Sequence, residues 1–160
     1  MIPEAPIYRE DSCSEREVLA HLEACDEQFR PPLSARVELA RYAGKIRARA
    51  RTFEAWQGEV LAGLVAAYFD PAARSAYVTS VSVLPQFGRR GIARRLMEAC
   101  LAHATRAGTT KVSLEVAAAS PGAVSLYAQL GFEESGRSGE NLFMTLTLKP
   151  AGSEREGTRW

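Results

Sequence analysis

The chain has 160 residues, of which 46% are hydrophobic, and this is enough for one sizeable core but too little for two ordinary domains. We therefore expect a single domain over residues 1–150, followed by a polar and flexible tail over residues 151–160. The formal net charge of +1 provides no overall attraction to nucleic acid or to an anionic membrane. The sequence has no apolar run near the ~20 residues of a membrane span and no signal-peptide core, which predicts a cytoplasmic protein.

The cysteines are odd in number and lack the spacing of metal ligands. Cys13, Cys25 and Cys100 lie far apart in the sequence, and Cys100 falls on the apolar face of a predicted helix. The simplest interpretation is that all three are reduced, partly buried thiols. No metal is expected.

Two helices are predicted at the start of the chain. Residues 14–28 have apolar residues at helical spacing after Ser14, which is a candidate cap. The sequence Phe-Arg-Pro-Pro at residues 29–32 breaks this helix, and residues 34–50 resume the helical spacing.

Strands dominate the middle of the chain, and helices separate the later ones. Apolar runs between turn residues predict strands over residues 52–56, 60–69, 76–84, 111–116, 132–135 and 142–148. A third helix is predicted from Ile92 to near Gly108. A fourth has Ser120 as its N-cap, Pro121 as its first residue and Gly131 as the residue that stops it.

The connection between the third strand and the third helix has the features of an anion site. It reads Gly-Arg-Arg-Gly-Ile-Ala at residues 88–93, and Gly88 and Gly91 allow the backbone to come close to a ligand. The first helical turn presents N–H groups, the helix dipole favours negative charge, and Arg89, Arg90, Arg94 and Arg95 add positive charge. The loop is neither a Walker A nor a dinucleotide-binding sequence, and a glycine turn before an ordinary helix is the alternative.

A second motif lies at the end of the fourth helix, where residues 126–132 read Leu-Tyr-Ala-Gln-Leu-Gly-Phe. Together the two motifs resemble the GNAT superfamily of acyl-CoA-dependent N-acetyltransferases. Its pyrophosphate loop reads Gln/Arg-x-x-Gly-x-Gly/Ala, and a later helix ends in Leu-Tyr-x-x-x-Gly-Phe. This chain departs at Gly88, where the family has Gln or Arg, and at Ser120, where many members have Asn. The resemblance in motifs covers residues 77–132.

The resemblance implies an α/β GNAT fold with a mixed, mostly antiparallel central sheet of six to seven strands, flanked by about four helices and splayed at the acetyl-CoA site. It implies that the backbone of Val81 and Val83, on a bulged strand, holds the pantetheine arm and the thioester oxygen. The loop N–H groups and arginines would hold the phosphates. The residues expected to bind acetyl-CoA are Val81, Ser82, Val83, Gly88, Arg89, Arg90, Gly91, Ile92, Ala93, Arg94 and Ser120.

The family motif also implies a catalytic acid. It places the hydroxyl of Tyr127 near the CoA sulfur, so Tyr127 is expected to protonate the leaving thiolate, and a core aromatic is the alternative role.

A general base is less apparent. The strand before the loop offers Thr79, Ser80 and Ser82 but no carboxylate, so a water relay ending at Glu54 or Glu115 is expected, unless these are solvated strand-face charges. The two histidines are poor candidates, because His103 lies late on the third helix and His21 is more typical of a surface helix residue.

The acceptor cannot be identified from the sequence. The basic row Arg41, Lys45 and Arg49 suits an acidic acceptor but is more simply a solvated helix face, whereas Glu23, Asp26 and Glu27 suit a cationic amine. We expect direct acetyl transfer to a primary amine of a small molecule, because no cysteine lies beside the motifs to carry an acyl group. A protein N-terminal or lysine acetyltransferase and a non-catalytic acyl-CoA sensor are the alternatives. Nucleic-acid binding is disfavoured, and a homodimer is left open.

Overall fold

The computed structural model describes residues 5–29 and 31–149, so the predicted tail over residues 151–160 lies outside the described residues. The strands are β1 (Ile7–Glu10), β2 (Arg51–Gln57), β3 (Val60–Asp70), β4 (Ser75–Val83), β5 (Lys111–Ala117), β6 (Glu133–Ser138) and β7 (Asn141–Thr147). The helices are α1 (Glu15–Cys25), α2 (Leu39–Arg49), α3 (Ile92–Arg106) and α4 (Pro121–Gln129). Short 3-10 turns are η1 (Asp26–Gln28), η2 (Leu33–Ala35) and η3 (Pro85–Phe87).

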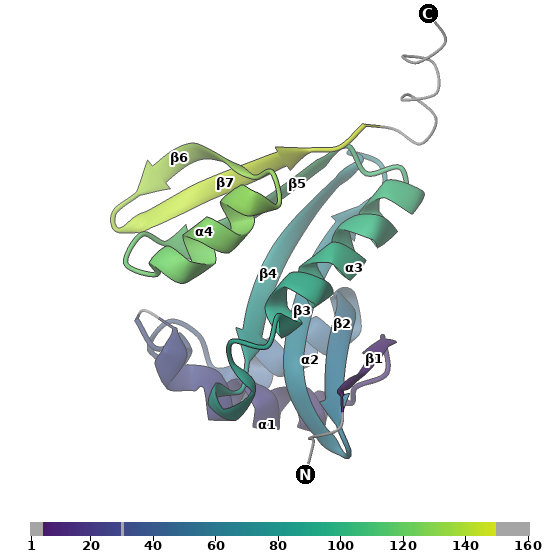
Figure 1. Ribbon diagram of the computed structural model, residues 1–160, viewed down its shortest axis with the longest axis vertical. Helices are drawn as coiled ribbons and strands as arrows, with labels where there is room; N and C mark the ends of the chain where they lie inside the picture. Colours follow the sequence, from purple (N-terminus) through teal and green to yellow (C-terminus); the bar gives the residue numbers. More distant parts are fainter. Residues whose placement is uncertain (1–4, 30, 150–160) are drawn as a thin grey trace, which may run out of the picture. The chain divides into compact units, whose positions relative to one another are not determined.

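The strands form one open, seven-stranded sheet in the order β1-β2-β3-β4-β5-β7-β6 (Figure 1). β4 and β5 are parallel, with pairs from Ser75↔Lys111 to Val78↔Leu114, whereas β1–β2, β2–β3, β5–β7 and β6–β7 are antiparallel. The expected α/β fold, with a mostly antiparallel sheet and four helices, is therefore confirmed.

Two features of the N-terminal region differ from the sequence-based expectation. β1 is absent from the predicted elements because it is only four residues long and mostly exposed, so it has no clear apolar alternation. The second helix begins at Leu39, not at residue 34, because η2 and a turn precede it. Glu38 caps this helix by accepting hydrogen bonds from the N–H groups of Ala40 and Arg41 at 3.2 and 2.9 Å.

Close contacts divide the chain into two compact units. The first unit contains Met1–Ala67 and Ser80–Met97, and the second contains Tyr68–Thr79 and Glu98–Trp160. Within the part of the chain that the structure describes, no helix is long and apolar enough to cross a membrane.

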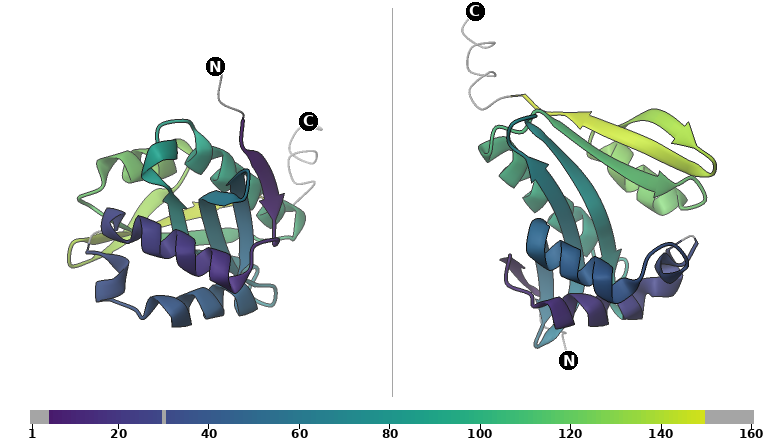
Figure 2. Two further views of the ribbon diagram at one scale, coloured as in Figure 1. Left: turned by 90° about the horizontal axis from the view of Figure 1, so that it is seen from below. Right: turned by 180° about the vertical axis from the view of Figure 1, so that it is seen from behind.

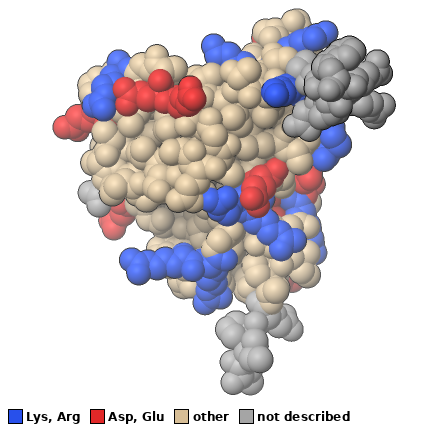
Figure 3. All heavy atoms as spheres, turned by 45° about the horizontal axis from the view of Figure 1, so that its top comes forward, with Lys and Arg blue, Asp and Glu red and all other residues tan. Residues whose placement is uncertain are grey.

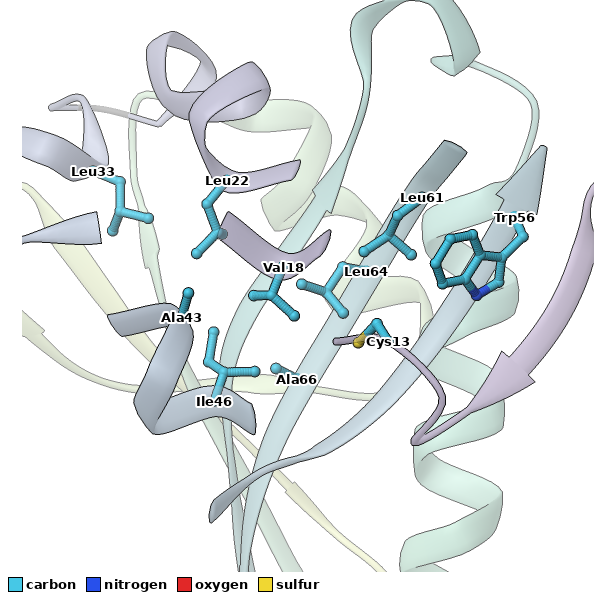
Figure 4. Close-up of a cluster of buried hydrophobic side chains, with 10 residues drawn as sticks. All are labelled: Cys13, Val18, Leu22, Leu33, Ala43, Ile46, Trp56, Leu61, Leu64 and Ala66. Carbon is cyan, nitrogen blue, oxygen red and sulfur yellow. The ribbon is translucent and has the colours of Figure 1, made fainter. Parts of the chain in front are cut away.

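The core of the first unit lies on both faces of β2 and β3. α1 and α2 cover one face, and the first turns of α3 cover the other (Figures 1 and 2). Side chains of α1, α2, β2 and β3 form one apolar cluster with residues of η2 and of the loop before α1 (Figure 4). This cluster contains Cys13, Val18, Leu22, Leu33, Ala43, Ile46, Trp56, Leu61, Leu64 and Ala66.

Gly63 lets α3 approach the opposite face of β3. A Cβ atom added at Gly63 would lie 2.7 Å from Cγ2 of Ile92 and 3.2 Å from Cδ1 of Leu96. These distances are shorter than a carbon–carbon van der Waals contact. The absence of a side chain in the strand therefore sets how closely the start of α3, which carries the predicted anion site, packs on the sheet.

In the second unit, β5 and β6 both pair with β7, and α4 ends as the sequence predicts. Gly131 follows the helix with φ +104°, a conformation that favours glycine, and the N–H of Phe132 donates to the carbonyl of Tyr127 at 3.0 Å. The ring of Tyr127 then meets that of Phe132 edge to face, with centroids 6.0 Å apart. The end of α4 thus buries Tyr127 in this unit.

Candidate functional site

The predicted acetyl-CoA residues of the first unit lie on the end of β4, the following loop and the start of α3. The chain leaves the sheet after Val83, where the N–H of Leu84 donates to the carbonyl of Ala62 on β3 at 2.8 Å. η3 then leads into the GRRGIA loop, which we define as residues 88–93. The bond to β3 fixes the point from which this loop begins.

The start of α3 presents N–H groups that precede the helical hydrogen-bond ladder. The ladder opens with the bond from the N–H of Arg95 to the carbonyl of Gly91, at 3.1 Å. The N–H groups of Ile92, Ala93 and Arg94 lie before it, as the first N–H groups of every α-helix do. Together with the positive end of the helix dipole, they favour an anionic group at this position.

The conformation of Gly91 leaves room for a ligand beside this backbone. Its φ is +76°, and apart from Gly91 and its two chain neighbours no described residue lies within 4 Å of the position that a Cβ would take. The preceding Arg89 also has a positive φ, +61°. A Cβ at Gly88 would instead lie 3.3 Å from the carbonyl oxygen of Pro85. The backbone conformation therefore favours glycine at position 91, and glycine at position 88 relieves crowding.

The four arginines of this region are not equivalent. The guanidinium of Arg90 lies 5.4 Å from the ring centroid of Phe87, and that of Arg95 lies 4.0 Å from the ring centroid of Tyr8. Arg89 is exposed, and Arg94 is half-buried. On the face drawn in Figure 3, Lys and Arg side chains stand in small groups between acidic side chains and wide uncharged areas. Because the formal net charge of the whole chain is only +1, the positive charge of the GRRGIA loop is a local feature.

β4 presents different chemistry on its two faces. Side chains alternate along a strand, and here Ser80 and Ser82 are buried whereas Val81 and Val83 are half-buried. The parallel pairs with β5 end at Val78, well before β4 ends.

His21 is buried, so its interpretation as a surface helix residue was wrong. It lies on α1 and is 3% exposed. Its Nδ1 is 2.8 Å from the carbonyl oxygen of Leu61, and its Nε2 is 2.9 Å from Oγ of Ser82. The sequence reasoning missed this contact because the partners come from β3 and β4, 40 and 61 residues away in the chain.

Glu54 is a structural anchor, so neither role considered for it, the end of a water relay or a solvated charge, is correct. Its carboxylate is 0% exposed and accepts hydrogen bonds from Ser12 N and Oγ, Cys13 N, Thr52 Oγ1 and Trp56 Nε1. Burial alone would raise the pKa of Glu54, but the hydrogen bonds from Ser12, Thr52 and Trp56 outweigh it and lower the pKa below its usual 4.5. The residue holds the loop before α1 against β2.

The other acidic candidates also have structural partners. Glu115 is exposed and accepts a hydrogen bond from Nδ2 of Asn141 at 2.5 Å. Asp26 accepts hydrogen bonds from the N–H and Oγ of Ser34 at 2.7 and 2.6 Å, which joins η1 to η2. The basic row of α2 lies on an exposed helix face, as expected. Among the described residues, no group of three or more His, Cys, Asp and Glu could hold a metal ion.

In the second unit, Tyr127 is buried and Ser120 begins α4. Burial raises the pKa of Tyr127 to about 12, so its hydroxyl keeps its proton at neutral pH. Ser120 occupies the N-cap position and is followed by Pro121, as expected, but its side chain makes no capping hydrogen bond within the described chain. Its hydroxyl is therefore not used to cap the helix.

The open α/β sheet, with a glycine- and arginine-rich loop between β4 and α3, has the arrangement that the resemblance to acyl-CoA-dependent N-acetyltransferases implies. The model of the Acetyltransferase (GNAT) family matches residues 16–132, and the chain belongs to this family of N-acetyltransferases. No curated protein matches the chain in sequence.

Several solved structures share the fold at low sequence identity. The ribosomal-protein-S18-alanine N-acetyltransferase from Escherichia coli is 20% identical, with a TM-score of 0.70 over 91% of this chain and 97% of that one. The PaiA N-acetyltransferase from Thermoplasma acidophilum, solved with coenzyme A, is 13% identical, with a TM-score of 0.71 over 89% and 99%. YncA from Salmonella typhimurium, solved with acetyl-CoA, is 18% identical, with a TM-score of 0.71 over 91% and 95%.

Proposed function

We propose that this protein transfers an acetyl group directly from acetyl-CoA to a primary amine of a small molecule. The observation that carries the proposal is the GRRGIA loop at the start of α3, in a chain of the GNAT family. There, N–H groups precede the helical ladder and open space lies beside Gly91. An exposed backbone of this form suits a pyrophosphate, since it can approach the anion closely and the helix dipole favours the charge.

Each part of acetyl-CoA is proposed to contact a chemically suitable group of the protein. The N–H groups of the loop would take the pyrophosphate, and the guanidinium groups of Arg89, Arg90 or Arg94 would take the adenosine-side phosphate. Val81 and Val83 would hold the pantetheine arm through their backbone, and Ser120 would contribute its hydroxyl. When bound, acetyl-CoA supplies an acetyl group activated as a thioester.

Tyr127 is proposed as the proton donor to the leaving sulfur. A buried phenol with a raised pKa stays protonated at neutral pH, as a general acid must. A phenol with a pKa of about 12 is a weaker acid than a thiol with a pKa of ~8.5, so Tyr127 would assist departure by donating its proton in a hydrogen bond to the sulfur while negative charge develops there. We further propose that residues 1–150 act as one domain in the cytoplasm, and three free, buried cysteines support this location.

The test is a panel of amines incubated with acetyl-CoA, with release of free thiol as the signal. Small-molecule amines should release thiol above the hydrolysis background. Peptides with free N-termini and with internal lysines form the second half of the panel, and turnover of these alone would make the protein a protein acetyltransferase. Binding of CoA without thiol release in single-turnover experiments would contradict an enzymatic role and indicate a sensor.

A further inference from the structure

The side chain of His21 connects three elements of the first unit. It projects from α1, its Nδ1 meets the carbonyl oxygen of Leu61 on β3 at 2.8 Å, and its Nε2 meets Oγ of Ser82 on β4 at 2.9 Å. A carbonyl oxygen only accepts hydrogen bonds, so Nδ1 carries the proton of the neutral ring. Nε2 is then an acceptor, and the hydroxyl of Ser82 must donate to it.

The surroundings keep the imidazole neutral. Burial lowers the pKa of His21 below its usual 6.5, more than its two hydrogen bonds raise it. The thiol of Cys25 also contacts the ring, since its Sγ lies 3.7 Å from Nε2, and burial raises the pKa of this thiol to about 11. Glu17 and Glu59 line the same pocket of about 270 Å³ as His21. A ring that is neutral at physiological pH keeps the free lone pair on Nε2 that a proton acceptor needs.

Ser82 lies on β4 beside the residues that are proposed to contact the thioester. It sits on β4 between Val81 and Val83, whose backbone is proposed to hold the thioester end of acetyl-CoA. On the same face of β4, Oγ of Ser80 is buried and has no hydrogen-bond partner among the described residues. A buried hydroxyl without a partner is uncommon, because leaving it unpaired costs free energy. The two serines therefore offer hydroxyl groups for a polar ligand beside the expected reaction centre.

We propose that Ser82 and His21 form a proton relay that deprotonates the acceptor amine. This inference rests on the proposed function. Ser82 contacts the amine and is the catalytic residue, whereas His21 acts through Ser82 and is a positioning residue that takes up the proton. The carbonyl of Leu61 fixes the ring so that its lone pair faces the hydroxyl.

The proposed reaction removes two protons from the acceptor nitrogen and exchanges one carbon–sulfur bond for one nitrogen–carbon bond. The ammonium form of the acceptor gives one proton to Oγ of Ser82, as the proton of that hydroxyl passes to Nε2 of His21. The neutral amine forms the nitrogen–carbon bond and the carbon–sulfur bond breaks. The leaving sulfur takes up a proton by way of Tyr127, the amide nitrogen releases its second proton to solvent, and Tyr127 regains a proton from solvent. His21 then returns its proton through Ser82 to solvent.

The test compares Ser82→Ala and His21→Asn with the wild-type enzyme, using an amine that the panel identifies as a substrate. Asparagine keeps a donor for the carbonyl of Leu61 but has no acceptor at the position of Nε2. At neutral pH both variants should lose about 100-fold or more in kcat, the scale of general base catalysis, with little change in KM for acetyl-CoA. The loss should shrink as pH rises, because the amine then deprotonates without help.

His103→Asn is the matched control, since the chain has two histidines and His103 packs on Phe69 in the second unit. It should keep the wild-type pH profile. A loss of activity in Ser82→Ala that is the same at every pH would indicate a structural role and overturn the relay, as would an unchanged kcat. A wild-type protein that acetylates no amine would instead overturn the proposed function, and the relay with it.

If Ser82→Ala and His21→Asn do not fold, the relay can still be tested by NMR of a protein that keeps both Ser82 and His21. In the His103→Asn protein, heteronuclear NMR of the remaining imidazole should show a proton on Nδ1 and none on Nε2 at neutral pH. A proton on Nε2, or a ring that is charged at neutral pH, would overturn the relay, because Ser82 would then have no acceptor for its proton.

Discussion

Replacement of the buried carboxylate of Glu54 by an amide should destabilise the fold measurably. Two donors point at Oε1, from Ser12 Oγ and Trp56 Nε1, and three point at Oε2, from Ser12 N, Cys13 N and Thr52 Oγ1. Glu54→Gln keeps the shape but replaces one acceptor oxygen by an NH₂ group, which only donates. At least one buried donor must then lose its partner.

The structure indicates which donor this is. An NH₂ group on the Oε2 side would face two backbone N–H groups, those of Ser12 and Cys13, which cannot become acceptors. On the Oε1 side the hydroxyl of Ser12 can rotate and accept, so only Trp56 Nε1 loses its partner. An unsatisfied buried donor costs about 1–3 kcal/mol, and the remaining bonds lose their charge assistance. We expect Glu54→Gln to lower the free energy of unfolding by about 2–4 kcal/mol.

Urea unfolding followed by circular dichroism measures this loss, and its pH dependence gives an internal control. The folded-state pKa of Glu54 is below 4.5, so its stabilising contribution is complete above that pH and disappears as pH falls through the folded pKa. The difference between wild type and Glu54→Gln should therefore shrink in acid. A loss below about 0.5 kcal/mol at neutral pH, the size of an ordinary surface substitution, would refute the assignment of these hydrogen bonds.

The site itself yields three further expectations. Gly91→Glu should abolish CoA binding, because the φ of +76° at this position strains any side chain and a carboxylate repels phosphate. An unchanged CoA affinity of this variant by calorimetry would exclude the loop as the phosphate site. Dephospho-CoA should bind more weakly than CoA, and added salt should weaken both; equal affinities would mean that the arginines do not contact the ribose phosphate. Tyr127→Phe should lower kcat by about 10- to 1,000-fold with less effect on KM for acetyl-CoA, towards the lower end because a thiol leaves readily. A wild-type kcat, measured where chemistry limits turnover, would make Tyr127 a packing residue.

Local sequence signals account for most of the fold. Ser14 caps α1 in a complete capping box with Glu17, and Pro121 and Gly131 bracket α4 where the sequence places them. These signals are readable because each acts within a few residues. β1 and the late start of α2 were not predictable in the same way, since β1 is defined by pairing with β2, more than 40 positions along the chain.

The residues of the candidate site show the same difference between local signals and long-range contacts. Gly91 and Tyr127 belong to contiguous motifs, so they could be selected from the sequence, and their positive φ and burial agree with the roles considered. Glu54 and His21 were misinterpreted because their polar residue types suggest exposure to solvent, although His21 shares the helical spacing of the buried residues Val18 and Cys25. Only tertiary packing supplies the donors that make a buried carboxylate tolerable.

The pairing of His21 with Ser82 is not needed to build this core. When both partners of a buried hydrogen bond are replaced by apolar groups of similar shape, stability is often unchanged or improved. Val18 and Leu22 of α1 already belong to the apolar cluster, so a buried apolar side chain at position 21 would be an ordinary choice on this helix face. A lone imidazole, oriented by a backbone carbonyl and directed at a strand hydroxyl, therefore makes more chemical sense as a proton acceptor than as a packing element. A strand that carries no carboxylate next to the proposed thioester contacts is where such an acceptor is needed.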